Sequence, residues 1–255
     1  MTRVSVVTGV ASGIGKATAG LLKARGETVI GVDQHDADIV ADLSAPEGLA
    51  AMVEAVSKAS GGVVDSVYGI AGVAHDTSLA VKVNFFGMVG TLTGLRPLLA
   101  KSSAPRAQAI ASMASLQDAD EQLVNLMLAG DREAAIARAD EIAGQNLIYA
   151  STKQAFARWI RRNAATADWA GASIPLNAVA PGIIRTPMTA DMIATKEAES
   201  QLLQVVPMPL NGVAEPSVVG ELLAWLGSDA NTHLCGQVVF VDGGSDVVIR
   251  GDSTW

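Results

Sequence analysis

Short apolar runs alternate with stretches of helical periodicity along this 255-residue chain. Runs rich in Val, Ile and Ala with turn residues at their ends predict strands at residues 3–8, 28–33, 66–70, 106–112, 176–180 and 238–241. Apolar residues three and four apart predict helices at residues 12–25, 48–59, 81–100, 147–167 and 217–226. This alternation, with strands apolar on both faces, predicts an α/β fold: a Rossmann-type, doubly wound parallel sheet with helices on both faces.

Two segments interrupt the alternation. Residues 117–145 read as a charged, Ala-rich helical insert. Residues 187–211 form a helical stretch rich in Met and Leu between two Pro-containing loops. No internal repeat, linker or low-complexity tract divides the sequence, so we expect a single domain over residues 1–255.

The charge balance and the cysteine count narrow the possible partners. A formal net charge of -8 repels nucleic acid and anionic membranes at long range, so we expect neither as a partner. The single cysteine, Cys235, excludes an internal disulfide and agrees with a reducing compartment. The first nine residues lack the apolar core of a signal peptide, and no uncharged apolar run reaches the length of a membrane span. We therefore expect a cytoplasmic protein.

Metal chemistry is not indicated by the histidines. His35, His75 and His233 are far apart in sequence and lack metal-ligand spacing. His75 lies near the loop that follows the third predicted strand, where contact with a substrate and a plain surface role are both open. We expect no metal site.

A glycine-rich turn, Thr8-Gly9-Val10-Ala11-Ser12-Gly13-Ile14-Gly15, joins the first predicted strand to the first helix. Glycines there permit a tight turn and close approach of a pyrophosphate, and the helix N-terminus adds amide donors and a positive dipole end. Such a motif is weak evidence alone, but its place between a first strand and an amphipathic helix strengthens it. The turn predicts a dinucleotide site.

Asp33 ends the second predicted strand, where a carboxylate can accept hydrogen bonds from both ribose hydroxyls of an adenosine. The same carboxylate would repel the 2′-phosphate of NADP, and Ser12 and Gln34 offer no positive charge to hold that phosphate. We therefore expect NAD as the cofactor. Asp42-Leu43 could contact the adenine edge, although a capping role for Asp42 explains that residue as well.

Tyr149 is one of only two tyrosines, and Lys153 follows it four residues later in a predicted helix. Residues four apart share a helix face, so the ammonium and the phenol would be neighbours. A nearby positive charge favours phenolate, so we expect the pKa of Tyr149 to be lowered from its usual value of about 10. The pair predicts a general acid/base.

Two other polar side chains are candidates for the same site. Ser112 ends the strand before the insert and could hydrogen-bond the substrate oxygen beside Tyr149, with Ser115 as a competitor. Asn84 lies inside a predicted helix, where asparagine is unfavourable. It could kink that helix with a water molecule, or it could merely be tolerated.

Over nearly its whole length the chain resembles the short-chain dehydrogenase/reductase family. The motifs that carry the resemblance are the turn at 8–15, Asp33, Asp42-Leu43, Ala71-Gly72, Asn84, Ser112, Tyr149, Lys153, Pro181-Gly182 with Thr186, and Asp242-Gly243-Gly244. The resemblance implies an NAD-dependent oxidoreductase that interconverts a secondary alcohol and a ketone.

Family roles carried onto this sequence divide into catalysis and cofactor binding. The resemblance implies that Tyr149 exchanges the proton, Ser112 orients the substrate oxygen, and Lys153 holds the nicotinamide ribose. Asn84 would support a water-linked proton relay through Lys153. The implied cofactor-binding residues are Gly9, Ser12, Gly13, Ile14, Gly15, Asp33, Asp42, Leu43, Ala71, Gly72, Tyr149, Lys153, Pro181, Gly182, Ile184 and Thr186.

The chain departs from the usual family pattern at three places. Gly69-Ile70-Ala71-Gly72 stands where members usually have Asn-Asn-Ala-Gly, which puts a local stabilising contact in doubt. The connection from Gly72 to Asn84 is short, and the one from Ser112 to Tyr149 is long. The 117–145 insert is similar to that of the bacterial 3-alpha-hydroxysteroid dehydrogenase/carbonyl reductase subgroup. In that subgroup the insert alters subunit association, so we expect a homo-oligomer, with a dimer favoured over the usual family tetramer.

Residues 187–211 fall where the family carries its substrate lid. Met188, Met192 and Met208 make this segment apolar, which suits bulky apolar ligands or equally the packing of the lid onto the body. No Arg or Lys cluster offers a phosphate site. We expect an apolar, alicyclic substrate such as a steroid or terpenoid. The alternatives are a reductase of a sugar, polyol or acyl-carrier substrate, a non-catalytic NAD-binding regulator, and an assembly protein that uses the insert as an interface.

Overall fold

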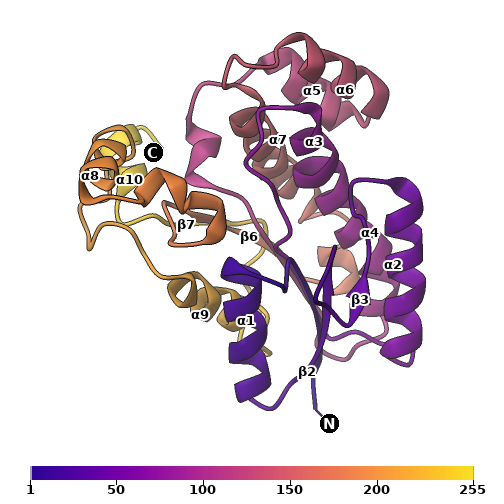
Figure 1. The fold of residues 1–255 in the computed structure, drawn as a ribbon. Coiled ribbons are helices and arrows are strands. Elements are labelled where there is room, and N and C mark those ends of the chain that lie inside the picture. The colour runs from indigo at the N-terminus through magenta and orange to yellow at the C-terminus, as the bar shows by residue number, and fades with distance from the viewer. Residues whose placement is uncertain (1, 255) are drawn as a thin grey trace.

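The computed structural model describes residues 2–254, in which seven strands form one wholly parallel sheet (Figure 1). The order across the sheet is β3-β2-β1-β4-β5-β6-β7. The strands are β1 (Val4–Thr8), β2 (Thr28–Asp33), β3 (Ile39–Val40), β4 (Ser66–Gly69), β5 (Arg106–Ile110), β6 (Leu176–Pro181) and β7 (Val238–Val241). The predicted doubly wound parallel sheet is confirmed. The strand β3 was not predicted, because two residues carry no periodicity.

Helices cover both faces of the sheet, as predicted. On one face lie α1 (Gly13–Ala24) and α9 (Pro216–Leu226), and their apolar side chains share a core with β1 and β4. On the other face lie α2 (Pro46–Ala59), α4 (Met88–Leu99) and α7 (Ile148–Asn163), over a larger core (Figure 1). The strands are therefore buried on both sides, which explains why they are apolar throughout rather than alternating.

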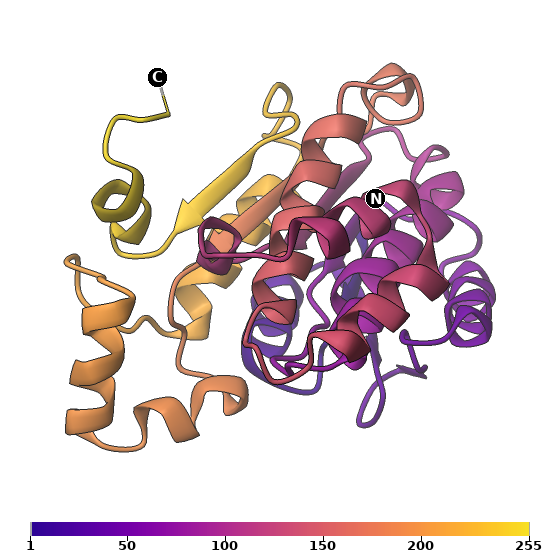
Figure 2. The same ribbon diagram turned by 90° about the horizontal axis from the view of Figure 1, so that it is seen from above.

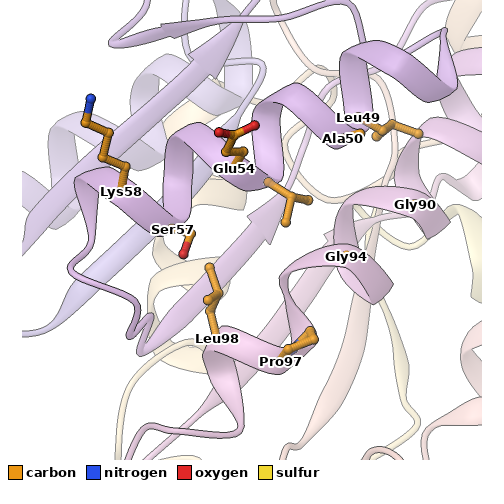
Figure 3. A pocket seen from close by; sticks show the side chains of 10 residues that line it. Leu49, Ala50, Glu54, Ser57, Lys58, Gly90, Gly94, Pro97 and Leu98 are labelled. Atoms are coloured by element: carbon orange, nitrogen blue, oxygen red, sulfur yellow. The ribbon is translucent and has the colours of Figure 1, made fainter.

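Two glycines let α2 approach α4 closely. A Cβ on Gly90 would lie 2.6 Å from Leu49 Cδ1, and one on Gly94 would lie 2.7 Å from Val53 Cγ2. Figure 3 shows these glycines on one helix facing Leu49 on the other, along a groove that ends near Pro97 and Leu98. This contact seats α2 against the half of the sheet that carries β1 and β2.

The predicted helical insert folds into two helices. After the 3₁₀ turn η2 (Met113–Leu116), α5 (Glu121–Ala129) and α6 (Arg132–Glu141) are separated by Gly130, whose φ of 77° ends α5 in a left-handed turn. Asp120 caps α5 by accepting from the Leu123 amide, and Arg138 holds the same carboxylate at 2.7 and 3.2 Å. Both helices pack outside the sheet layers, α5 on α7 and α6 on η1 (Figure 1).

A second excursion lies beyond the carboxyl end of β6. It comprises η4 (Pro187–Thr189), η5 (Asp191–Ile193) and α8 (Lys196–Val205), with α10 (Ser245–Arg250) on the same side of the molecule (Figure 2). Ile193, Val206 and Met208 pack with Met113 and Ile183 in a small separate core. This core joins the excursion to the body of the domain.

The connection from β4 to α4 is compressed. A single turn, α3 (Ser78–Ala80), passes into seven residues of π-helix, η1 (Val81–Gly87), before α4 begins. Between Gly72 and Asn84, the only regular structure before the π-helix is thus the three-residue α3. The continuous stretch Ser78–Leu99 is long and apolar enough to cross a membrane by composition, but 56% of its most apolar window is buried inside the domain. This stretch is therefore a core helix that packs against the sheet.

Candidate active site

All strands are parallel, so their carboxyl ends meet at one edge of the sheet. The order reverses between β1 and β4, and at such a switch point the loops diverge and leave a crevice. A cleft opens there. Its lining includes most of the predicted site residues: Gly9, Ser12, Gly13, Ile14, Gly15, Asp33, Leu43, Ala71, Gly72, Ser112, Tyr149, Lys153, Pro181, Gly182, Ile184 and Thr186. Asp42 and Asn84 are the two predicted residues outside that lining.

The glycine turn is tight and braced against its neighbours. Gly9 and Gly13 have φ values of 73° and 51°, which side chains rarely adopt. A Cβ on Gly15 would overlap the carbonyl oxygen of Gly9. Thr8 Oγ1 accepts from the amides of Ile70 and Ala71 at 2.9 and 3.0 Å, tying the turn to the end of β4. The turn therefore presents bare backbone to the cleft at the N-terminus of α1.

Asp33 lies at the end of β2 with its side chain 15% exposed. Its carboxylate accepts from the Ala11 amide at 3.0 Å and from the Gln34 amide at 2.7 Å, which fixes it beside the glycine turn. Among the described residues that line the cleft, Asp33 and Lys153 alone carry charge. The end of the cleft beside β2 is thus acidic.

Asp42 faces away from the cleft. Its side chain accepts from the Ser44 amide at 2.8 Å, and this hydrogen bonding to Ser44 lowers the pKa of Asp42. Leu43 and the unpredicted Ala41 line the cleft instead. Asp42 therefore closes a turn at Ser44 and does not cap α2, whose N-cap residue is Ala45. Of the predicted pair, Leu43 is the residue that lines the cleft.

The Tyr149 phenol and the Lys153 amine share one face of α7. Lys153 Nζ lies 5.6 Å from the centre of the Tyr149 ring and 3.4 Å from the carbonyl oxygen of Ile110, to which it donates. The Lys153 side chain is buried, and burial lowers its pKa from 10.5 to about 8. A cationic side chain is therefore held beneath the phenol at neutral pH.

The expected lowering of the Tyr149 pKa is wrong for this structure. Burial raises the pKa of Tyr149 above its usual value of 10.0, and the interaction with the Ser112 side chain offsets this only partly. Desolvation of the phenolate is the larger of these two effects, because burial disfavours the charged form of the phenol. Tyr149 is therefore a phenol that can donate a proton and hold a hydrogen bond at neutral pH.

Ser112 lies two residues beyond β5, not within it, because the strand ends at Ile110. Its hydroxyl accepts from the Ala114 amide at 3.1 Å and so begins η2. Ser115, the competitor, is buried away from the cleft lining. Ser112 is thus the serine that stands beside Tyr149.

Asn84 lies in the middle of the π-helix η1. The helix is therefore irregular at the position where the sequence places an asparagine, a residue that is unfavourable inside a regular helix. Its amide pairs with the backbone of Val73, accepting at 2.9 Å and donating at 2.9 Å, and it reaches Thr152 Oγ1 at 3.4 Å. A Cβ on Gly72 would lie 3.2 Å from Asn84 Oδ1 and 3.9 Å from Lys153 Nζ. Asn84 therefore holds the β4 loop against the catalytic helix from outside the cleft lining.

The far end of the cleft is formed after β6. Gly182 donates to Val241 at 3.0 Å, and a Cβ there would lie 2.9 Å from the Asp242 Cα, so the turn requires glycine. Thr186 and Thr189 form a reciprocal cap at the start of η4. Met188 of the predicted lid also lines the cleft. Val73, Val83 and Pro187, which sequence reasoning missed, add further apolar side chains to the lining. Their signal in the sequence is only that they neighbour the motif residues.

The remaining predicted features are placed as follows. Met188 lines the cleft and is 46% exposed, whereas Met208 is buried in the small lid core, so the Met-rich segment serves both of the roles weighed for it. His75 is exposed and does not line the cleft. Within residues 2–254, no group of three or more His, Cys, Asp or Glu side chains is arranged to hold a metal ion.

Comparisons with known proteins agree with this geometry. A family model described as enoyl-(acyl carrier protein) reductase matches residues 9–246. The 3-alpha-hydroxysteroid dehydrogenase/carbonyl reductase of Comamonas testosteroni is 35% identical, with 96% of this chain and 97% of that protein covered. The cis-4-hydroxycyclohexanecarboxylate dehydrogenase of Sinomonas cyclohexanicum is 30% identical, with 96% and 97% covered.

A solved structure gives the same result. The 3-alpha-hydroxysteroid dehydrogenase of Pseudomonas sp. B-0831, complexed with NADH, superposes with a TM-score of 0.90 at 39% identity, covering 98% of this chain and 99% of that one. Both the sequence and the fold match over nearly the whole length. The chain belongs to the short-chain dehydrogenase/reductase family and is an oxidoreductase of that type, close to hydroxysteroid dehydrogenase/carbonyl reductase.

Proposed function

We propose that this enzyme uses NAD to interconvert a secondary alcohol and a ketone on an apolar, alicyclic substrate. The observation that carries the proposal is one cleft in which Ser112, Tyr149 and Lys153 meet at one end and Asp33 stands at the other. The glycine turn lies between them. No second charged pair lines the cleft among the described residues, so the chemistry has one centre.

The residues present fit a nicotinamide dinucleotide. Gly9, Gly13 and Gly15 leave bare backbone where a Cβ would collide or strain, and the N-terminus of α1 opens onto the same space. Asp33 favours NAD over NADP, because a carboxylate accepts from ribose hydroxyls and repels a phosphate. The complex of the Pseudomonas relative with NADH supports the same choice.

NAD, when bound, supplies the hydride acceptor. In the oxidative direction the phenolate form of Tyr149 would take the proton from the substrate hydroxyl and become the phenol, and in the reverse direction the phenol would donate that proton to the carbonyl oxygen and become the phenolate. Ser112 donates a hydrogen bond to the same oxygen and so orients it. The Lys153 ammonium stabilises the phenolate formed at Tyr149, since a positive charge nearby favours the ionised phenol.

The substrate class follows from the apolar part of the cleft lining. Val73, Val83 and Met188 are apolar, and no cation lies there to recognise a phosphate or coenzyme A. Flexible methionine at the mouth suits bulky ligands of irregular shape. Both curated relatives described above act, by their names, on ring-bearing alcohols, which supports an alicyclic alcohol over a sugar or an acyl-carrier substrate.

The compartment and the assembly belong to the same proposal. A cytoplasmic location agrees with the single cysteine and with the NAD pool available there. We propose a homo-oligomer, with a dimer favoured because α5 and α6 cover part of α7 and η1. Light scattering on the wild type and on a variant lacking the insert measures this directly.

The test of function is NADH formation by the purified protein against steroid, terpenoid and simple cyclic alcohols, with NADP in parallel. Turnover with NAD that Tyr149→Phe abolishes, while NAD binding is retained, supports the proposal. Turnover with NADP alone would overturn the argument from Asp33. NAD binding without turnover on any alcohol would favour a regulator that retained the fold.

A further inference from the structure

The catalytic helix α7 begins without a cap of its own. Leu147 occupies the N-cap position and makes no side-chain hydrogen bond there, and no acidic residue lies in the first turn. The first amides of a helix have no partner inside the helix and need acceptors from elsewhere. Tyr149 is the second residue of α7, so whatever holds these amides also fixes the start of the segment that carries the phenol.

Asp76 supplies that acceptor from another part of the chain. Its Oδ2 accepts from the amides of Gly144 and Asn146, both at 2.8 Å, and its Oδ1 accepts from the Ile148 amide at 3.2 Å. Ile148 is the first residue of α7 and directly precedes Tyr149. One carboxylate therefore gathers three backbone donors from the five residues before the phenol.

The backbone ahead of α7 is shaped for this contact. Gly144 and Asn146 have φ values of 83° and 58°, and these left-handed turns direct their amides to the same carboxylate. A negative charge at this point also lies at the positive end of the α7 dipole. The insert ends here, so Asp76 fixes the position at which the chain leaves the insert and enters the catalytic helix.

The loop that carries Asp76 is itself tied to the cleft. Asn84 holds both backbone groups of Val73, and Val73 lines the cleft three residues before Asp76. Asp76 therefore connects the cofactor side of the site to the segment that carries Tyr149. This connection uses the shortened β4–α4 loop.

We propose that Asp76 is a positioning residue that sets the place of Tyr149 through the N-terminus of α7. The proposal rests on the function proposed above, in which Tyr149 transfers the proton. The cofactor-binding turn and Asp33 lie on α1 and β2, outside the contacts of Asp76. Loss of Asp76 should therefore lower the rate of proton transfer more than it lowers NAD affinity.

The first experiment compares Asp76→Ala, Asp76→Asn and the matched control Thr77→Ala in the full-length protein. Thr77 is exposed in the same loop and caps no helix with its side chain. We expect Asp76→Ala to lower kcat by about tenfold to a hundredfold, as misplacement of a catalytic group does, with NAD Kd within about twofold of wild type. Asp76→Asn keeps an oxygen acceptor and should recover most of the rate, and Thr77→Ala should match wild type.

Two outcomes of this experiment would overturn the proposal. One is a wild type that turns over while Asp76→Ala retains its kcat. The other is a parallel loss of kcat and NAD binding in proportion to unfolded protein, with no recovery in Asp76→Asn. A wild type that turns over no alcohol instead counts against the proposed function, and the second experiment then decides the role of Asp76.

The second experiment needs no turnover. Tyr68 and Tyr149 are the two tyrosines, and the Tyr68 hydroxyl makes no hydrogen bond within the described residues, so Tyr68→Phe leaves Tyr149 as the single phenol to titrate. Burial raises the pKa of Tyr149, so release of the α7 N-terminus should bring it back toward 10.0. We expect phenolate absorbance to show this fall in Tyr68→Phe/Asp76→Ala and a smaller one with Asp76→Asn. Equal titration of all three proteins would contradict the positioning role.

Discussion

The buried charge of Lys153, which the proposed mechanism needs, should lower the free energy of unfolding. Its side chain is buried, and its pKa is lowered from 10.5 to about 8 by desolvation. Each unit of pKa corresponds to about 1.4 kcal/mol, so the difference between the two values corresponds to about 3 kcal/mol. Below pH 8 the amine is charged in both folded and unfolded protein, and the full cost of burying it is present.

The sign of the pH dependence follows from proton binding. Between pH 8 and 10.5 the unfolded chain holds the Lys153 proton while the folded protein has lost it. Stability rises with pH wherever the unfolded state binds more protons, so this cost disappears as pH rises through that window. Lys153→Met keeps the length of the side chain without its charge. At neutral pH and without cofactor it should be more stable than wild type by about 3 kcal/mol.

Urea unfolding followed by tryptophan fluorescence measures this at fixed protomer concentration. Comparison of the two proteins at about pH 7 and about pH 10 cancels the other groups that titrate. Lys101→Met, at an exposed position, serves as the control and should show a small change that is independent of pH. A Lys153→Met protein that is less stable than wild type by the same amount at both pH values would refute the reasoning. The same variant should lose turnover, because the charge that costs stability is the one that the proposed mechanism requires.

Three further predictions test the cofactor end, the helix packing and the insert. Asp33→Ala should weaken NAD binding by about tenfold to a hundredfold and reduce the discrimination against NADP. Fluorescence titration with both cofactors measures this, and an unchanged ratio of the two affinities would contradict the role of Asp33. Gly87→Ala should lower the melting temperature, because the added Cβ would lie 2.6 Å from the Leu43 carbonyl oxygen. The cost of this overpacking, about 1–3 kcal/mol, exceeds the gain in helix propensity, and a higher melting temperature would show that the contact relaxes. Asp120→Asn keeps the α5 cap but loses the ion pair with Arg138, which lowers the pKa of Asp120 below 3.8, so we expect a destabilisation of about 1 kcal/mol at neutral pH. This difference should begin to shrink as the pH falls through 3.8 and disappear once Asp120 is protonated in the folded protein as well; a difference that persists in that acid range would exclude the pair as its cause.

The features that the sequence predicted well are those fixed by local pattern. The bounds of β2 and β7 agree with the prediction to the residue, because each is a short run of apolar side chains between turn residues. The turn at residues 8–15 had to be glycine-rich because backbone from β1, α1 and β4 converges there. Such signals need no knowledge of distant parts of the chain.

The features that were missed depend on three-dimensional context. Asp42 and Leu43 are adjacent in sequence, but in the loop after β3 the Asp42 side chain binds the Ser44 amide while Leu43 lines the cleft, and only the folded loop shows this. The pKa of Tyr149 is raised by burial and lowered in part by the Ser112 hydrogen bond, and neither the burial nor that contact can be inferred from a helix pattern. The helix α10 is six residues long, too short for periodicity to identify.

The contacts of Asp76 are the clearest example of a feature that could not be predicted from the sequence. Nothing in its neighbours marks it, since its three donors lie 68 to 72 residues further along the chain. Its carboxylate links the short β4–α4 connection to the end of the insert, at the point where the chain enters α7.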